Sequence, residues 1–256
     1  MLERIIRFKE QEVRELKKSG GMDDIAFPLP SLEVDRVFRN CQDSIAVIAE
    51  IKQASPVKGV LAHELNIRQL AGCYRENGAA AISYITDNRF FRGRKELLPR
   101  VKEVTGLPVL RKDFIIDEIQ LYETVGLQAD MVLLITALHD YPELLALCEK
   151  SRELGLEVLL EVHDREELQK AIDLPVKMLG INNRNLQDFS VDLHRSVELA
   201  QYIPPSMIKV SESGIKTRED VRLLREQGYN ALLVGESLVT ASDPGEKLRE
   251  LREGKA

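Results

Sequence analysis

Residues 207–237 read MIKVSESGIKTREDVRLLREQGYNALLVGES, in which two short apolar runs flank an amphipathic stretch. The runs at 207–210 and 231–234 have the length and composition of buried strands. Between them, apolar residues recur at helical spacing over 218–227, which predicts a helix with Thr217 as its N-cap and Gly228 directly after its last turn. A strand, a helix and a second strand in this order form a βαβ unit, whose two strands are parallel.

The same unit repeats along the whole chain. Further apolar runs give eight predicted strands in all, the other six being 45–51, 80–85, 108–110, 131–135, 156–160 and 178–181. Helical spacing predicts helices at 68–77, 96–104, 117–125, 141–153, 165–172, 195–203, 218–227 and 243–252, the last with Ser242 as its cap. Eight repeats in 256 residues predict an α/β protein with one (β/α)8 barrel. A doubly wound open sheet is the alternative, but it usually has fewer repeats.

Residues 1–43 precede the first predicted strand and form an N-terminal extension. Leu2, Ile5, Ile6 and Val13 form an apolar stripe at helical spacing among charged residues. We expect this helical extension to pack across one end of the barrel, so that residues 1–256 form a single domain. Ordinary packing at the bottom of the barrel is the alternative role for the extension.

Charge and composition exclude several classes of partner. The chain has 36 Lys and Arg against 42 Asp and Glu, a net charge of −6, so no overall positive field attracts nucleic acid or an anionic membrane. No run approaches the roughly 20 apolar residues of a membrane span, and residues 1–18 lack the apolar core of a signal peptide. Cys41, Cys73 and Cys148 have no metal-binding or redox spacing. We therefore expect a cytoplasmic protein with reduced thiols.

Polar residues follow six of the predicted strands, where a barrel carries its chemistry. The segments are Glu50 to Lys52, Lys112-Asp113, Glu161, Asn182 to Arg184, Ser211 to Gly214 and Gly235 to Ser237. Side chains alternate along a strand, so Glu50 and Lys52 point the same way and lie in one mouth with Lys112. A solvated loop charge is the alternative for each residue singly, but it does not explain why such residues gather at one end of the barrel.

Two glycine turns predict a phosphate site. Ser213-Gly214 and Gly235 follow adjacent predicted strands and leave backbone N–H groups free at helix N-termini, an arrangement that binds phosphate in many barrels. Glycine is also a common turn residue, so each signal alone is weak.

The strand-end segments occur in an order that resembles a known family. They are AEIK (49–52) with SP (55–56) and KG (58–59), LRKDF (110–114), LEVH (160–163), GINNRNL (180–186), SESGI (211–215) and VGESL (234–238). In this order they resemble the indole-3-glycerol phosphate synthases of tryptophan biosynthesis, over all eight strands and the extension. The resemblance implies ring closure of 1-(2-carboxyphenylamino)-1-deoxyribulose 5-phosphate, with loss of CO2 and water.

The resemblance also implies roles for six catalytic residues. Lys112 is the general acid for the ketone oxygen, and Glu161 is the base for rearomatisation and dehydration. Lys52 is a second cationic group, and Glu50 is a carboxylate coupled to both lysines. Asn182 and Glu212 match positions that hydrogen-bond the substrate or its neighbours. The resemblance does not decide whether Lys52 or Lys112 serves the dehydration step.

Further positions match the substrate-binding residues of the family. Arg184 is a candidate for the substrate carboxylate, and Lys52, Lys112 and Arg184 together form a cationic mouth. Backbone groups of Ser213, Gly214, Gly235 and Glu236, with Ser55 nearby, are expected to hold phosphate. Some relatives have serine in place of Glu236, so we expect only its N–H to face the ligand. Phe91, Phe114, Leu133 and Leu134 resemble the apolar wall beside the aromatic ring.

Three other functions compete with this interpretation. Another phosphosugar barrel, such as phosphoribosylanthranilate isomerase or the tryptophan synthase alpha subunit, is the nearest; the isomerase family has a cysteine where the first strand here ends in Glu50 and Lys52. A non-catalytic binding barrel would lack one of the strand-end lysines or glutamates. A metal enzyme is disfavoured because His63, His139 and His194 lack ligand spacing. We expect no cofactor or metal, one small phosphorylated substrate, and a monomer or weak homo-oligomer.

Overall fold

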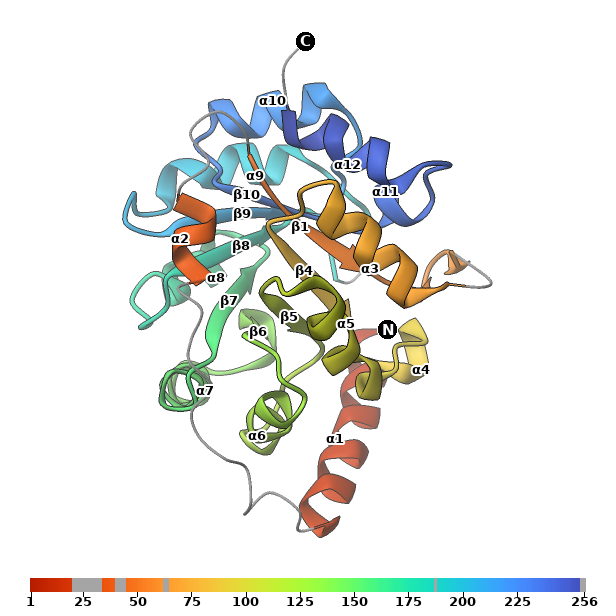
Figure 1. The fold of residues 1–256 in the computed structure, drawn as a ribbon. Coiled ribbons are helices and arrows are strands. Elements are labelled where there is room, and N and C mark those ends of the chain that lie inside the picture. Colours follow the sequence, from red (N-terminus) through yellow and green to blue (C-terminus); the bar gives the residue numbers. More distant parts are fainter. Residues whose placement is uncertain (20–33, 40–44, 62–64, 187, 254–256) are drawn as a thin grey trace.

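Eight parallel strands close into a barrel in the computed structural model, which describes residues 1–19, 34–39, 45–61, 65–186 and 188–253 (Figure 1). In barrel order the strands are β1 (Ala46–Ile51), β10 (Ala231–Val234), β9 (Ile208–Glu212), β8 (Met178–Asn182), β7 (Glu157–Val162), β6 (Met131–Ile135), β5 (Val109–Lys112) and β4 (Ala81–Ile85). The predicted (β/α)8 barrel is confirmed, and the open sheet is excluded because β1 pairs with both β4 and β10.

An outer ring of helices covers the barrel. It contains α3 (Ile67–Glu76), α5 (Leu98–Thr105), α6 (Ile119–Gly126), α7 (Tyr141–Glu153), α8 (Arg165–Ala171), α9 (His194–Leu199), α10 (Arg218–Glu226) and α12 (Pro244–Glu253). Their apolar faces pack on outward-facing strand residues such as Val47 and Leu134 in one buried cluster. Inward-facing residues such as Ile48, Leu110 and Leu133 fill the inside of the barrel. Leu134 therefore belongs to the outer layer, and its expected place in the pocket wall is wrong.

The caps agree with the sequence at one helix and differ at another. The Thr217 side chain accepts from the backbone N–H of Asp220, whose side chain bonds back to the Thr217 backbone, and Gly228 has a left-handed φ of 79°. At α12 the expected cap Ser242 is wrong, because Asp243 Oδ1 accepts from Glu246 N at 2.9 Å. A carboxylate one position later thus accepts from one of the free N–H groups in the first turn of the helix.

Four strands extend further than the apolar runs that predicted them. β5, β7, β8 and β9 continue into Lys112, Glu161, Asn182 and Glu212. The 3-10 turns Lys95–Leu97 and Ala200–Tyr202 fall at the ends of the segments predicted as helices 96–104 and 195–203. The short elements that were not predicted are the hairpin of β2 (Ala54–Ser55) and β3 (Gly59–Val60), the helices α4 (Asn88–Phe91) and α11 (Glu236–Val239), and the 3-10 turn Thr136–Leu138. Most of them lie in the loops that follow strands, where short-range signals are weak.

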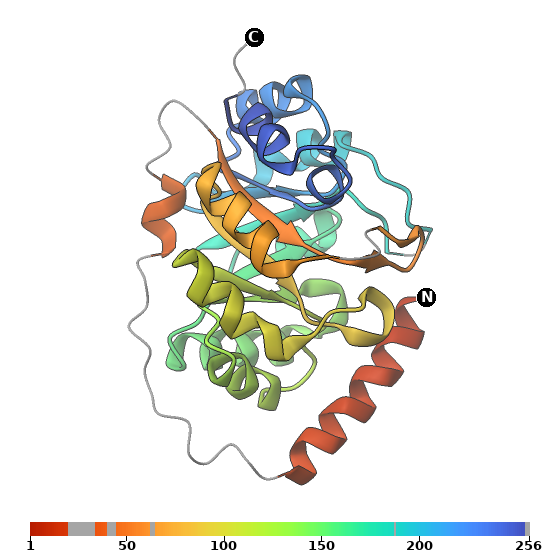
Figure 2. The same cartoon turned by 45° about the vertical axis from the view of Figure 1, so that its right-hand side comes forward.

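The N-terminal extension contributes two helices at opposite ends of the barrel (Figure 2). In α2 (Val34–Arg39), Val34 and Phe38 pack against residues at the amino ends of the strands inside the barrel. α1 (Leu2–Ser19) begins at the other end, beside α4, and its Leu2 and Ile5 line the main cavity. Residues 20–33 and 40–43 of the extension, with Cys41, lie outside the described residues, as does His63.

No helix in the described part of the chain is long and apolar enough to cross a membrane. Cys73 and Cys148 are free thiols.

Candidate active site

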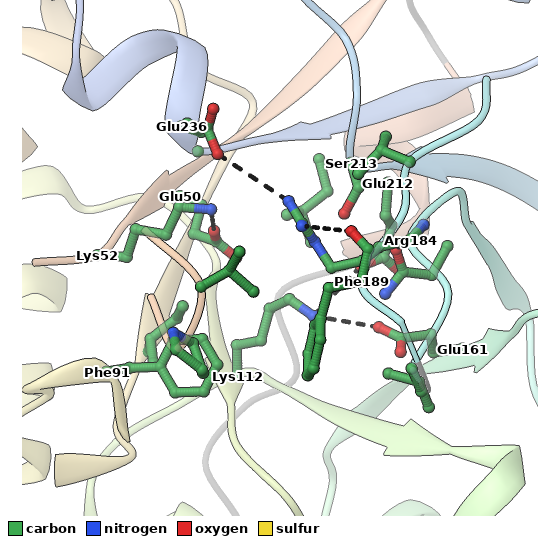
Figure 3. Close-up of a pocket in the computed structure, with 18 of the residues that line it drawn as sticks. Glu50, Lys52, Phe91, Lys112, Glu161, Arg184, Phe189, Glu212, Ser213 and Glu236 are labelled. Carbon is green, nitrogen blue, oxygen red and sulfur yellow. Dashed lines mark hydrogen bonds and ion pairs between the residues drawn. The ribbon is translucent and has the colours of Figure 1, made fainter. Parts of the chain in front are cut away.

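A cavity of about 320 Å³ opens at the carboxyl ends of the strands (Figure 3). Most of the predicted site residues line it: Glu50, Lys52, Phe91, Lys112, Phe114, Leu133, Glu161, Asn182, Arg184, Glu212, Ser213, Gly214, Gly235 and Glu236. Ser55 is not among the residues that line the cavity, although its neighbours Pro56 and Val57 are. The Ser55 hydroxyl instead accepts from Lys58 N at 3.1 Å within the β2–β3 turn.

Lys112 lies at the centre of the cavity between two buried carboxylates. Its Nζ lies 3.1 Å from Glu161 Oε2 and 3.3 Å from Glu212 Oε2. Lys112, Glu161, Glu212 and Glu50 come from β5, β7, β9 and β1, which are alternate strands of the barrel. Alternate strands supply one layer of side chains in such a barrel, so the fold itself brings these four groups together.

Burial and charge act on these groups in opposite directions. Burial disfavours the Lys112 ammonium, but Glu161, Glu212 and Glu50 outweigh it and hold the pKa of Lys112 above its ordinary value. Burial likewise opposes ionisation of Glu161, yet Lys112, with His163 and Asn182, keeps the pKa of Glu161 below its ordinary value. Lys112 and Glu161 therefore form a charged pair at neutral pH.

Glu212 has the opposite shift from Glu161. Burial, with repulsion from Glu161 and Glu50, raises the pKa of Glu212 to about 8 against the opposing effect of Lys112. Apart from the Lys112 ion pair, its two carboxylate oxygens have no hydrogen-bond partner among the described residues, and neither has Glu50 Oε2. Buried polar atoms are normally paired, so these oxygens are available to a bound ligand. Glu161 and Glu212 therefore differ in protonation state near neutral pH, although both contact Lys112.

Two glycines make room for the buried carboxylates, and only one was singled out from sequence. A Cβ at Gly235 would clash with Glu50 Oε1, and a Cβ at Gly180 would clash with Glu212 Oε1. Gly235 was predicted as a phosphate turn; the Glu50 contact is a separate reason for glycine there. Gly180 has no turn signal in the sequence because it lies within β8.

A second group of charges lies across the mouth of the cavity. Lys52 Nζ is 2.8 Å from Glu50 Oε1, and Glu236 forms ion pairs with Lys58 and, at 4.0 Å, with Arg184. Burial opposes ionisation of Glu236, but Lys58, Lys52 and Arg184 lower its pKa. The Glu236 carboxylate thus points at Arg184 across the mouth (Figure 3), where only its N–H was expected to face the ligand.

His163 holds the second oxygen of Glu161 and was not predicted as a site residue. Its Nε2 is 3.1 Å from Glu161 Oε1 and its Nδ1 is 3.0 Å from Glu167 Oε2. Burial favours the neutral ring, but the two carboxylates raise the pKa of His163 to about 10. A protonated imidazole therefore stands behind Glu161. The alternation of β7 places both residues on one strand face, which is the sequence signal for this pair.

Aromatic and aliphatic side chains form the opposite wall. The rings of Phe91 and Phe114 have centroids 6.3 Å apart, and Leu133 lies on the same lining. Sequence reasoning missed several apolar members of the lining, namely Leu2, Ile5, Leu186, Phe189 and Val191. These residues belong to α1 and to the β8–α9 loop, whose position cannot be read from local periodicity.

The two expected phosphate turns face the same cavity. Ser213 and Gly214 both have left-handed φ values, 67° and 84°. Successive residues in such turns direct their backbone N–H groups into a concave, anion-binding surface. Gly235 immediately precedes α11, whose first residue is Glu236. Both turns line the cavity beside Arg184.

A (β/α)8 barrel with lysine–glutamate pairs at the carboxyl ends of alternate strands defines a barrel enzyme with acid–base chemistry. A family model described as indole-3-glycerol phosphate synthase matches residues 2–251. The chain belongs to the indole-3-glycerol phosphate synthase family.

Curated relatives with that name match over nearly their whole length. The chain is 43% identical over 252 residues to indole-3-glycerol phosphate synthase of Legionella pneumophila (strain Paris), covering 98% of each chain. It is 41% identical over 257 residues to the protein of the same name from Alkaliphilus metalliredigens, covering 99% of this chain and 98% of the relative.

Solved structures at low sequence identity share the barrel. 3-Hexulose-6-phosphate synthase from Salmonella typhimurium is 13% identical with a TM-score of 0.65, covering 81% of this chain and 96% of that chain. Thiamine phosphate pyrophosphorylase from Pyrococcus furiosus is 16% identical with a TM-score of 0.61, covering 82% of this chain and 95% of that chain. These similarities show the fold alone.

Proposed function

We propose that this chain is a carbon–carbon lyase that converts 1-(2-carboxyphenylamino)-1-deoxyribulose 5-phosphate to indole-3-glycerol phosphate, CO2 and water in tryptophan biosynthesis. The family match over residues 2–251 supports the activity. One observation on the site carries the mechanism: the Lys112 ammonium lies within 3.3 Å of both Glu161 and Glu212 in the cavity.

Lys112 is the general acid of ring closure. As the aromatic carbon attacks the ketone, a C–C bond forms and the carbonyl oxygen takes a proton from the ammonium. Glu161 and Glu50, joined by Glu212 when it is ionised, keep Lys112 charged before the reaction, so the proton to be delivered is present. Loss of the carboxyl group as CO2 then leaves the bonding electron pair in the new ring system.

Glu161 is the base for the later steps. Rearomatisation requires removal of a proton, and the hydroxyl group leaves as water once it is protonated. Lys112 and Lys52 both line the cavity and can supply that proton, and each is paired with a carboxylate, Glu161 or Glu50. Asn182 and Glu212 are proposed to hydrogen-bond the substrate beside them.

The anionic groups of the substrate are proposed to bind on the side of the mouth formed by β8, β9 and β10. Backbone groups of Ser213, Gly214 and Gly235 hold the phosphate, and Arg184 takes the carboxylate. The Phe91 and Phe114 wall holds the aromatic ring. Because Ser55 does not line the cavity, we assign it no direct contact with the substrate.

The domain organisation, location and partners of the chain are also proposed. We propose one domain over residues 1–256, a cytoplasmic location, no metal or other cofactor, no nucleic-acid partner, and a monomer or weak homo-oligomer.

Substitution of the acid and the base tests this mechanism. We expect Lys112→Ala and Glu161→Gln each to lower kcat at least about a hundredfold, while circular dichroism shows that the fold survives. Lys170→Ala removes an exposed lysine on α8 that pairs with exposed Glu166, and it is expected to leave kcat unchanged. Near-normal turnover of Lys112→Ala, measured through indole fluorescence of the product, would overturn the assignment.

A further inference from the structure

The N-terminal helix carries a buried lysine that the proposed mechanism does not use. Lys9 of α1 is only 2% exposed. Its Nζ lies 2.8 Å from Asp113 Oδ1, 3.1 Å from Asp87 Oδ2 and 2.7 Å from Glu12 Oε2. Burial disfavours the ammonium, but Asp113 and Asp87 outweigh it and raise the pKa of Lys9. A lysine so deeply buried remains charged only because both carboxylates reach it.

Asp113 is connected directly to one side of the active site. It follows Lys112 in the chain, and its Oδ1 accepts from the backbone N–H of Phe114 at 2.8 Å. Its Oδ2 accepts from the Thr86 hydroxyl at 2.6 Å and from Arg111 at 3.3 Å. These bonds fix the end of β5, from which Lys112 and Phe114 project into the cavity.

Asp87 is connected to the other side of the active site, where Phe91 faces Phe114. It is the N-cap of α4, where its Oδ1 accepts from the backbone N–H groups of Phe90 at 2.7 Å and Phe91 at 3.3 Å. α4 carries Phe91, whose ring lies 6.3 Å from that of Phe114. Lys9 is therefore the cation that joins the two aromatic residues of the pocket wall through their backbones.

α1 is held in this place by further contacts with α4. The Phe8 and Phe90 rings are 5.8 Å apart, and the Arg89 guanidinium lies 3.9 Å above the Phe8 ring. The first turn of α1 reaches the mouth, where Leu2 and Ile5 line the cavity. In Figures 1 and 2, α1 starts beside α4 and then extends away from the barrel mouth.

We propose that Lys9 is a positioning residue of the active site, which sets the separation of Phe91 and Phe114 and the direction of Lys112 by bridging Asp87 and Asp113. This inference rests on the proposed function for its kinetic consequence. The phosphate turns at Gly214 and Gly235 follow β9 and β10, on other strands of the barrel, so the bridge orders the aromatic and acid groups and leaves the phosphate site unchanged.

Lys9→Met keeps an unbranched side chain and removes the cation. We expect kcat per folded protein to fall about ten- to a hundredfold, because a misplacement near 1 Å costs that much. The Ki of inorganic phosphate as a competitor is expected to stay within about twofold. The orphaned carboxylates also lower Tm, by about 5 to 15 °C. Lys17→Met is the matched control, since Lys17 pairs with Asp117 from an exposed position on α1, and its kcat should match wild type.

The double variant Lys9→Met/Asp87→Asn separates positioning from stability. The asparagine side chain still caps α4 but carries no orphaned charge, and Asp113 keeps its Arg111 partner, so part of the lost Tm should return. The bridge stays broken, so kcat should stay low. Recovery of kcat together with Tm would show a merely structural role and overturn the proposal, as would a Lys9→Met kcat within about twofold of wild type.

A crystal structure of Lys9→Met tests the geometry without any turnover. We expect the Phe91 and Phe114 centroids to separate beyond 6.3 Å and Lys112 Nζ to leave its place 3.1 Å from Glu161. Unchanged positions would overturn the proposal. If the wild-type protein makes no product, the proposed function fails, and this structure still decides the role of Lys9.

Discussion

At the scale of single residues, the site is a set of charges that burial and neighbours divide into different protonation states. Glu161 and Glu212 are both glutamates within 3.3 Å of Lys112, yet their pKa values shift in opposite directions. His163 stands behind Glu161, whereas Glu212 has no second cation among the described residues. The opposite pKa shifts of the two glutamates arise from this difference in their neighbours besides Lys112. The strand-end motifs in the sequence do not specify those neighbours.

Glu212 gives a pH prediction. Its pKa of about 8 means that the carboxyl is neutral at pH 7 and ionised at pH 9, where it repels an anionic substrate. We expect wild-type kcat/KM to fall about tenfold from pH 7 to pH 9. Glu212→Gln, which is neutral throughout, should lose this decline and change by less than about twofold, even if its overall rate is lower. A decline of equal size in both proteins would contradict the shifted pKa.

The raised pKa of Glu212 also makes the stability of the fold depend on pH. Because the folded protein binds the Glu212 proton more tightly than the unfolded chain, this group stabilises the fold at acid pH and loses that contribution as pH rises to about 8. Urea unfolding should therefore show Glu212→Gln gaining stability relative to wild type between about pH 4.5 and pH 8. If the difference in the free energy of unfolding between Glu212→Gln and wild type stays constant across that range, the pKa of Glu212 is not raised in the folded protein.

At the scale of elements, local periodicity predicts the strands and helices, but it places the ends of four strands, β5, β7, β8 and β9, too early. The apolar run 108–110 ends before Arg111 and Lys112, which a sequence pattern assigns to a loop. In the barrel, these side chains are paired with carboxylates and remain within β5. Tertiary ion pairs therefore accompany the extension of β5 beyond its apolar run, and the proposed general acid Lys112 is held by the sheet rather than by a loop.

A substitution at Gly180 tests whether the close approach of β8 to the Glu212 side chain of β9 matters for activity. A Cβ in β8 would meet Glu212 Oε1 of β9, so Gly180→Ala should displace Glu212 from Lys112 and lower kcat at least about tenfold. Gly72→Ala is the matched control. It lies in α3, where the nearest atom to a new Cβ is Val104 Cγ1 at 4.0 Å, and it should leave kcat unchanged and raise Tm slightly. Wild-type kcat for Gly180→Ala would show that the contact does not constrain Glu212.

The contacts of α1 with distant segments of the chain are not visible in the sequence. The stripe Leu2, Ile5 and Val13 predicts a buried helix face, yet it cannot indicate that Leu2 and Ile5 reach the catalytic cavity. Lys9 looks like one of many charges on that helix until Asp87 and Asp113 are brought beside it. Contacts between residues so far apart in the sequence carry no local signal.

At the scale of the whole molecule, the net charge of −6 is not offset by a free cationic mouth. Lys52, Lys112 and Arg184 line the cavity as expected, but each is paired with a glutamate. An anionic substrate must therefore exchange these ion pairs for its own, and backbone N–H groups, which carry no net charge, remain as donors for phosphate. Binding thus depends on how the barrel aligns its strand ends more than on total charge.

Incubation of the wild-type chain with 1-(2-carboxyphenylamino)-1-deoxyribulose 5-phosphate, without added metal or cofactor, tests the proposed synthase activity and its independence of cofactors. We expect stoichiometric indole-3-glycerol phosphate and CO2, with product fluorescence that appears for wild type and falls at least about a hundredfold for Lys112→Ala. Unchanged substrate after prolonged incubation of folded protein would contradict it.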